Sequence, residues 1–283
     1  MKIDLGCHID GYIAVAAHTL VVPDTPDAPP SVNDELGNVA VAAYNAMLVA
    51  AKSIAAGAKN TDVTAAVERV AKAYGVTPIS SVRMHQMKRY VLDGVKEVAL
   101  KTPDLTNELE QEEKLPDCTF EKAEVYAVDV AMSTGDGKVR PGEMRTTVFK
   151  RNVEKQYHLK VKASRAVLAE VDKKFPTLPF TLRHLSDVRQ ARLGIPECVQ
   201  HELLTMYPSL HEKNDALVAH FKCTVLLLPS GTVRVTGLDL PEYYKTSKEA
   251  DEETKKILQE IKEEEERKAA RKAAKKKKKK GGK

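Results

Sequence analysis

A run of eleven mostly apolar residues, 218–228, has a lysine at its centre, Lys222. Its β-branched residues and the Pro-Ser-Gly turn signal that follows predict a long strand. A charge inside a strand that is buried on both faces costs several kcal/mol unless a partner compensates it. Lys222 therefore either lies at an edge and points to water, or faces a buried site where acidic side chains meet it.

Two acidic residues also interrupt apolar strands. Asp4 lies in an alternating segment that a two-residue Asp-Gly turn at 10–11 connects to a second predicted strand, so the chain opens with a β-hairpin. Asp129 lies within a second apolar strand, 125–130. Each of the three charges alone is unremarkable in a partly exposed strand. Together, two carboxylates and one ammonium would compensate one another if the fold brings them to one place.

Length and composition limit the class of protein. With 283 residues, the chain has ample material for one large domain or two small ones. No apolar run approaches the roughly 20 residues that span a bilayer, and we expect no signal peptide and no membrane partner. The four cysteines are scattered without a Cys-x-x-Cys pair, which favours a reduced setting and gives no indication of a zinc site.

The net charge of +5 conceals a strong asymmetry. Residues 267–283 contain eleven Lys or Arg and no acid, and residues 145–192 contain twelve Lys or Arg against four acids. The rest of the chain is acidic. Two basic regions on an acidic body indicate a polyanionic partner that contacts particular surfaces.

Periodicity and turn signals predict the remaining elements. Helices are expected over 32–56, 62–74, 162–175 and 196–206, and residues 146–150 are expected to return along the strand at 125–130. Residues 248–274 have high helix propensity but almost no apolar stripe, so they predict a solvated helix or frayed tail. The six lysines at 275–280 repel one another and are expected to be disordered when free.

Several segments carry a family resemblance. The motifs are Lys2-Ile3-Asp4-Leu5-Gly6, Ala17-His18-Thr19, the strand 124–129 and the strand 219–227, with further matches at 81–94, 145–147, 178–183, 201–204 and the lysine-rich tail. In this order along the chain they resemble type 2 methionine aminopeptidases. They resemble still more the non-catalytic relatives of those enzymes, the proliferation-associated (ErbB receptor-binding) protein family.

The resemblance implies an α/β (α+β) pita-bread fold of the methionine aminopeptidase kind, in which two related halves surround a pseudo-twofold axis. It implies a pita-bread domain over 1–246 that carries a basic helical insert of the type 2 kind at 145–206. A charged tail follows at 247–283, lysine-rich from 267. Family members carry a longer segment ahead of the first motif, so part of the N-terminal half is expected to be missing here.

The resemblance also places the dimetal ligands of the enzymes, which are two Asp, one His and two Glu. They fall on Asp4, Val15, His85, Asp129 and Lys222, and a substrate-binding histidine of the enzymes falls on Asp93. Valine has no donor atom, and lysine puts a cation where a metal needs an anion. We therefore expect no dimetal centre, no cofactor and no aminopeptidase activity, with Lys222 pairing with Asp4 and Asp129 instead. His85 is expected to be an ordinary interior histidine.

By the same resemblance, the expected function is binding to ribosomal RNA and the large ribosomal subunit near the polypeptide exit, with ribosomal proteins there as further partners. The implied setting is ribosome biogenesis, translation and growth regulation in the cytoplasm and the nucleus or nucleolus, with the protein as a monomer. An active metal-dependent methionine aminopeptidase and a scaffold that uses the old substrate pocket are the alternatives. The lysine tail would bind RNA or serve as a nuclear address. The RNA-binding candidates are Lys150, Arg151, Lys155, Lys160, Lys162, Arg165, Lys173, Lys174, Lys275, Lys276, Lys277 and Lys278.

Overall fold

A computed structural model describes the chain except for residues 24, 26–27, 105, 107–113, 214 and 281–283. Its centre is an eight-stranded sheet in which every pairing is antiparallel, with the strand order β1-β2-β12-β6-β4-β5. Two short strands complete it, β13 beside β12 and β3 beside β6. Its strands are β1 (Lys2–Ile9), β2 (Tyr12–Thr19), β3 (Thr77–Pro78), β4 (Arg83–Met87), β5 (Glu97–Ala99), β6 (Val125–Ser133), β12 (Val218–Leu228) and β13 (Gly231–Arg234).

The opening hairpin is confirmed. Asp10 and Gly11 both have positive φ angles, 51° and 82°, which is the backbone geometry that a two-residue turn between twisted antiparallel strands requires. The long strand predicted around Lys222 is confirmed as well, since β12 spans Val218–Leu228 and lies between β2 and β6. Lys222 is therefore on an interior strand of the sheet and not at its edge.

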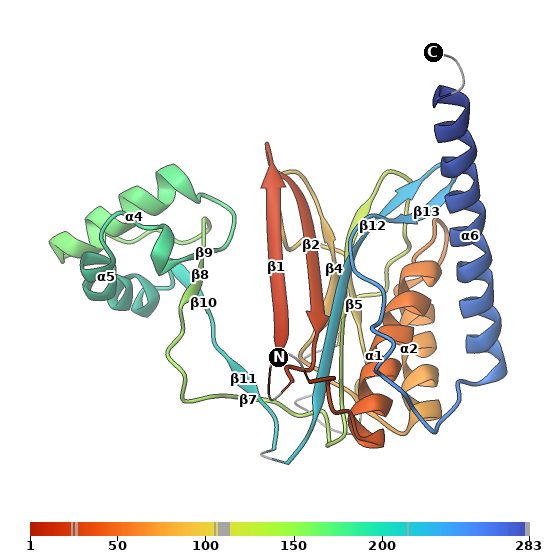
Figure 1. Cartoon of the computed structure of the whole chain (residues 1–283). Helices are drawn as coiled ribbons and strands as arrows, with labels where there is room; N and C mark the ends of the chain where they lie inside the picture. The colour runs from red at the N-terminus through yellow and green to blue at the C-terminus, as the bar shows by residue number, and fades with distance from the viewer. Residues whose placement is uncertain (24, 26–27, 105, 107–113, 214, 281–283) are drawn as a thin grey trace.

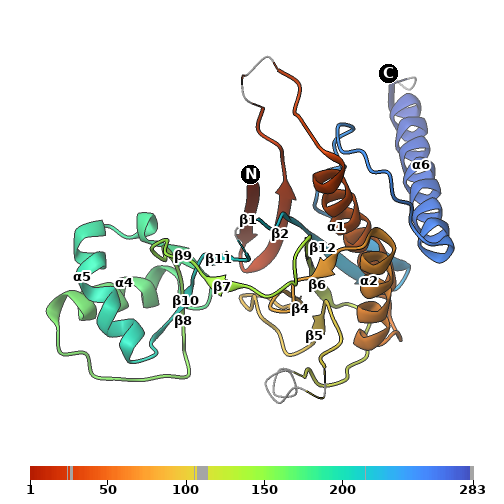
Figure 2. The same cartoon turned by 90° about the horizontal axis from the view of Figure 1, so that it is seen from below.

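Two helices cover one face of the sheet (Figure 1, Figure 2). Helix α1 (Asp34–Ser53) begins at Asn33, whose side chain accepts a hydrogen bond from the Leu36 backbone N–H. It is rich in alanine, and its buried alanines let it lie close to the sheet and to α2 (Asn60–Tyr74). Gly75, in the left-handed conformation, ends α2. The main core lies between this helical layer and the sheet.

A second compact unit stands to one side of the sheet, on the left in Figure 1. Its elements are β8 (Val148–Arg151), α4 (Lys162–Lys174), β9 (Phe180–Thr181), the 3₁₀ turn η1 (Leu182–His184), α5 (Val188–Gln200) and β10 (Leu204–Tyr207). They enclose a separate hydrophobic core, in which Phe149, Phe180 and Leu203 are among the buried side chains. A two-stranded ribbon, β7 (Arg140–Pro141) with β11 (Leu210–His211), connects this unit to the sheet.

Two predictions for this region were wrong. Residues 146–150 do not return along β6, because β8 pairs with β10 and β9 in a sheet of the small unit. The helix expected at 196–206 is α5, which begins at Val188, where the Asp187 side chain accepts hydrogen bonds from the backbone N–H groups of Arg189 and Gln190. Pro196, taken as a helix start, lies inside it, and residues 204–207 form strand β10.

The C-terminal helix also differs from expectation. Helix α6 (Glu252–Lys280) runs beside α1 and continues through the lysines expected to be disordered (Figure 1). Ile257 and Leu258 pack against the main core, and Glu264 and Glu265 form ion pairs with Lys52 of α1 and Arg234 of β13. A few residues on one face thus suffice to attach a helix that its composition suggested would be solvated. Among the described residues, no helix is both long and apolar enough to cross a membrane.

Candidate functional site

The antiparallel register brings the three unusual charges into one row across the sheet. Asp4 lies opposite Ala17, Ala17 lies opposite Lys222, and Lys222 lies opposite Asp129. Residues directly opposite each other on neighbouring strands project from the same face. The alanine between Asp4 and Lys222 carries only a methyl group, so the long lysine side chain can pass it and reach the carboxylate beyond.

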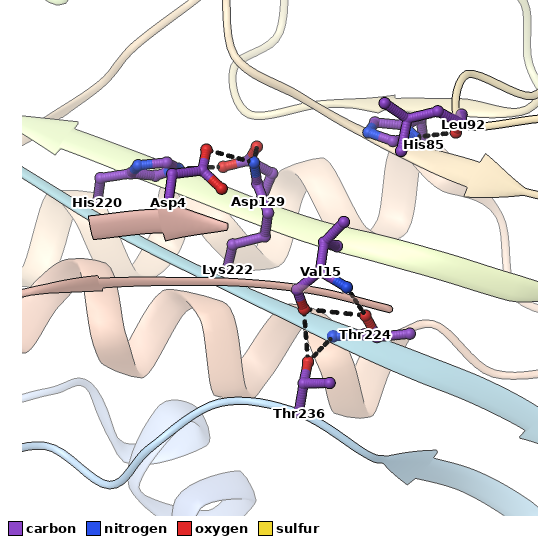
Figure 3. Close-up of polar contacts among 9 residues, drawn as sticks. All are labelled: Asp4, Val15, His85, Leu92, Asp129, His220, Lys222, Thr224 and Thr236. Atoms are coloured by element: carbon purple, nitrogen blue, oxygen red, sulfur yellow. Dashed lines mark hydrogen bonds and ion pairs between the residues drawn. The ribbon is translucent and has the colours of Figure 1, made fainter. Parts of the chain in front are cut away.

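The convergence expected from the sequence is present (Figure 3). The Lys222 Nζ atom lies 2.7 Å from Asp4 Oδ2 and 2.9 Å from Asp129 Oδ2. Side-chain exposure is only 14% for Lys222 and 13% for Asp129, whereas Asp4 is 47% exposed at the edge strand. Opposite charges at this separation and burial stabilise each other's ionised forms strongly.

A fourth group completes the network. His220, two residues before Lys222 and therefore on the same face of β12, places its Nε2 atom 2.6 Å from Asp129 Oδ1. An ionised carboxylate can only accept hydrogen bonds, so Nε2 carries the proton. His220 was not among the residues expected at this site. The signal that could have found it is its spacing of two from Lys222 within a strand.

The protonation states follow from this geometry. Burial opposes ionisation of Asp129, but the hydrogen bond from His220 and the ammonium of Lys222 outweigh it and hold the pKa of Asp129 below its ordinary value. Burial likewise opposes the charged form of Lys222, but the carboxylates of Asp129 and Asp4 raise its pKa above the ordinary value. Both groups are therefore charged at neutral pH.

Val15 and His85 lie on the same face, away from the ion pairs (Figure 3). The Val15 side chain packs in a small apolar cluster with Met87 and Ala127. Its backbone is held by Thr224, which accepts from the Val15 N–H at 2.9 Å and donates to the Val15 carbonyl at 3.0 Å. His85 donates from Nδ1 to the Leu92 carbonyl at 2.8 Å, so when neutral its proton is on Nδ1.

The five positions do not fit a dimetal centre. The two carboxylates that would have to bind cations are both engaged by the Lys222 ammonium, and Val15 offers a hydrocarbon surface where a bridging ligand would be needed. Within the residues that the structure describes, no group of three or more His, Cys, Asp or Glu is arranged to hold a metal ion.

A cavity of about 520 Å³ adjoins this row, between the β1–β2 hairpin and the small unit. Asp4, Val15, His85 and Lys222 line one side of it, and Phe180 and Tyr207 belong to the opposite wall. Asp93, which the family resemblance matches to a substrate-binding histidine of the enzymes, forms an ion pair with Lys150 of β8 at this junction. The contact ties the small unit to the loop that follows β4.

The basic candidates of the small unit divide into two groups. Lys150, Arg151, Lys155 and Lys174 form ion pairs with Asp93, Asp172, Glu202 and Glu170, and Arg165 donates to the carbonyls of Leu159 and Lys160. Lys160, Lys162 and Lys173 have exposed side chains for which the described residues provide no ion-pair partner. Lys275, Lys276, Lys277 and Lys278 lie near the end of α6, and their side chains fall outside what the structure describes.

Comparison with known proteins identifies relatives of this chain. Residues 1–110 match Metallopeptidase family M24. Over 89% of its length the chain is 46% identical to "ERBB-3 BINDING PROTEIN 1" of Solanum tuberosum, and over 85% it is 38% identical to "Proliferation-associated protein A" of Dictyostelium discoideum. By sequence, this chain is a homologue of the ERBB-3-binding and proliferation-associated proteins. It spans 62% and 60% of the length of these two relatives.

Solved structures confirm the fold expected for a homologue of the ERBB-3-binding proteins. A structure described as that of a thermophilic Arx1 superimposes with a TM-score of 0.80 at 29% identity, covering 91% of this chain and 72% of that one. Methionine aminopeptidase from Rickettsia prowazekii superimposes with a TM-score of 0.50 at 12% identity, covering 82% and 62%. The pita-bread, methionine aminopeptidase-like architecture is therefore established.

Proposed function

We propose that this homologue of the ERBB-3-binding proteins is a catalytically inactive member of the aminopeptidase fold. In our proposal it binds ribosomal RNA and the large ribosomal subunit near the polypeptide exit, and acts in ribosome biogenesis or translation in the cytoplasm and the nucleus or nucleolus. We assign residues 1–246 to the aminopeptidase-like domain, with an insert at 145–206, and residues 247–283 to a charged tail. The binding surface is the insert, aided by the basic end of α6.

The observation that carries the loss of catalysis is the position of Lys222. A dimetal hydrolase needs two adjacent cations held by bridging carboxylates, and a bridging water activated between them. Here an ammonium lies within 3 Å of both Asp4 and Asp129, so half of the negative charge that would attract a cation is already compensated and both carboxylates are engaged. Val15 removes a further oxygen ligand. The two substitutions act together against metal binding.

The exposed lysines of the insert support the binding role. Lys162 is the first residue of α4, whose first turn contains no acidic residue, and Lys160 precedes it by two positions. A lysine at the positive end of a helix dipole does not help the helix to form. The exposed side chains of Lys160 and Lys162 nevertheless make a favourable surface for phosphate.

Co-sedimentation with purified large ribosomal subunits tests this function. The variant Lys160→Glu/Lys162→Glu reverses two exposed lysines of the insert, and Lys72→Glu/Lys122→Glu makes the same charge change elsewhere on the molecule. We expect the first variant to lose binding and the second to keep it, with affinity falling steeply as salt is raised. Equal binding by both variants would refute the insert as the contact surface.

Two further assays address the alternatives. Methionine release from a peptide in the presence of added cobalt or manganese, abolished by His85→Ala, would establish an active enzyme and overturn the proposal. A scaffold that uses the cavity of about 520 Å³ is favoured by the apolar part of its lining, such as Val15 and Phe180. Substituting Val15→Arg would project a long charged side chain into that cavity, and we expect ribosome binding to survive it.

A further inference from the structure

The loop between β8 and α4 presents an aromatic pair at the surface of the insert. The rings of Tyr157 and His201 are stacked, with centroids 3.5 Å apart and planes inclined by 11°. His201 is the residue at which α5 ends, so the imidazole is held by a helix terminus. Tyr157 remains 39% exposed although His201 covers one face of its ring. A ligand could therefore reach the ring only from its other face or its edge.

The loop that carries Tyr157 is braced on both sides. Before it, Arg151 donates to the carbonyls of Asn152 and Lys155. After it, Glu197 of α5 accepts hydrogen bonds from the backbone N–H groups of Lys160 and Val161. These bonds use backbone groups and leave the side chains of Tyr157 and Lys160 outside the network. The loop thus holds an aromatic surface in place before any ligand arrives.

From this arrangement we propose that Tyr157, backed by His201, is a stacking platform for an unpaired nucleobase of RNA, with Lys160 and Lys162 contacting the neighbouring phosphates. The inference rests on the proposed function and names the form of RNA that the insert would take. The two lysines follow Tyr157 by three and five residues, so an extended segment keeps them within about 10 and 17 Å. A short stretch of single-stranded RNA covers that distance.

The chemistry distinguishes a platform from a merely basic face. Lysine contacts to phosphate bind single and double strands alike, and their strength falls with salt. An aromatic face adds a contribution that needs a splayed base, as in loops, bulges and single strands. A ring already stacked on a second ring loses little side-chain freedom on binding, because its rotamer is fixed beforehand. The platform should therefore favour unpaired RNA.

The test uses the full chain, a labelled oligouridine and a blunt RNA duplex of similar charge. We expect Tyr157→Ala to weaken oligouridine binding about tenfold with an unchanged salt slope, Tyr157→Phe to bind like the unaltered protein, and duplex binding to stay constant. The chain contains no tryptophan, so Tyr157→Trp supplies a single fluorophore. Its emission should be quenched when oligouridine binds. Leu193→Trp, at an exposed position of α5, should show no quenching.

The outcomes separate the platform from the binding function. Unchanged oligouridine affinity in Tyr157→Ala, or unquenched emission from Tyr157→Trp with oligouridine bound, would overturn the platform. If Lys160→Glu/Lys162→Glu still weakens binding in that case, the proposed function stands without it. If that charge reversal also has no effect, the insert is not the RNA-binding surface. Should Tyr157→Ala lower the melting temperature, the tryptophan variant, which retains a stacked ring, decides the matter.

Discussion

Lys222 and Asp129 lie directly opposite each other on adjacent antiparallel strands, and their charged groups are 2.9 Å apart. The pair is mostly buried, and His220 takes the second oxygen of the carboxylate. Removing one member of such a pair leaves the other as an uncompensated charge in the low-dielectric protein interior. The row of charges across the sheet is thus a structural element in its own right.

The first prediction concerns Lys222→Met, which keeps the aliphatic stem and removes the ammonium. We expect the free energy of unfolding at pH 7 to fall by about 3 kcal/mol, because the buried Asp129 carboxylate loses the ammonium that compensates its charge. Urea denaturation followed by circular dichroism measures it. Lys160→Met, at an exposed position, should change stability by no more than about 0.5 kcal/mol. Equal effects of the two substitutions would contradict the role given to the pair.

The second prediction concerns pH. The folded-state pKa of Asp129 is lowered from 3.8, so its contribution to stability is present above that value and is lost as pH falls through the lowered pKa. The pKa of Lys222 is raised from 10.5, so its contribution is complete below 10.5 and is lost as pH rises through the raised pKa. Between these limits the pair is intact.

Asp129→Asn provides the matching measurement. Because asparagine does not titrate, the variant should lose less stability than the unaltered protein when pH is lowered from neutral to below 3.8. Unfolding midpoints in urea at a series of pH values give the two slopes. Parallel stability curves of the two proteins in acid would show that folding does not lower the pKa of Asp129.

The third prediction concerns a variant with carboxylates at Val15 and Lys222, the two positions where the family resemblance implies metal ligands and this chain has none. Val15→Asp/Lys222→Glu replaces a hydrocarbon and a cation by two carboxylates beside Asp4 and Asp129. Without metal, the cluster of like charges should lower the melting temperature. With manganese added at about one hundred times its dissociation constant, binding to the folded state alone should return about 2.7 kcal/mol. The unaltered protein and Val15→Asp alone should show no such shift in a thermal melt.

The fourth prediction separates folding from binding within the insert. Arg151 has a nearly buried side chain that pairs with Asp172 at 2.8 Å and donates to backbone carbonyls, including that of Leu203. Arg151→Ala should therefore cost about 2 kcal/mol of stability, since hydrogen bonds to charged groups are the stronger kind. Lys173→Ala should leave the melting temperature unchanged. A binding loss in Arg151→Ala without any loss of stability would show that this arginine is a contact residue.

The fifth prediction concerns the attachment of α6. Ile257→Asp should release the helix from α1, because the apolar contact with the main core is lost. Glu264→Lys, which breaks the ion pair with Lys52, should have a small effect, since partly exposed ion pairs contribute roughly 0–1 kcal/mol. Hydrogen exchange of the α6 amides distinguishes the two. Faster exchange in Glu264→Lys than in Ile257→Asp would show that the ion pair, and not the apolar contact, holds α6 in place.

The sequence predicted those elements whose structure is determined by residues close to one another in the chain. The Asp10-Gly11 turn, the strand around Lys222 and the end of α2 at Tyr74 all follow from residues within a few positions of one another. The convergence of Asp4, Asp129 and Lys222 was anticipated because unpaired charges in strands demand partners. Their common row with Ala17 depends on register between strands up to 218 residues apart, which no local pattern specifies.

The failures have the same origin. Strand β8 has an ordinary strand sequence, and only the position of β10, more than 50 residues later, decides that it joins the small unit. Helix α6 was expected to be solvated because three apolar residues in a charged segment are a weak signal. Its docking depends on Lys52 and Arg234, which lie far away in the sequence. The helix α5 was predicted to start at Pro196 because proline is common at helix starts.

The row from Asp4 through Ala17 to Lys222 also helps to fix the register of β1 against β2. Sliding β1 by one residue would turn Asp4 to the opposite face. Sliding it by two would set either Lys2 or Gly6 opposite Ala17, and so offer Lys222 a like charge or no charge at all. Only the observed alignment presents a carboxylate at that point. The charges thus disfavour shifted registers of the β1–β2 hairpin and favour the same register as the turn at Asp10-Gly11.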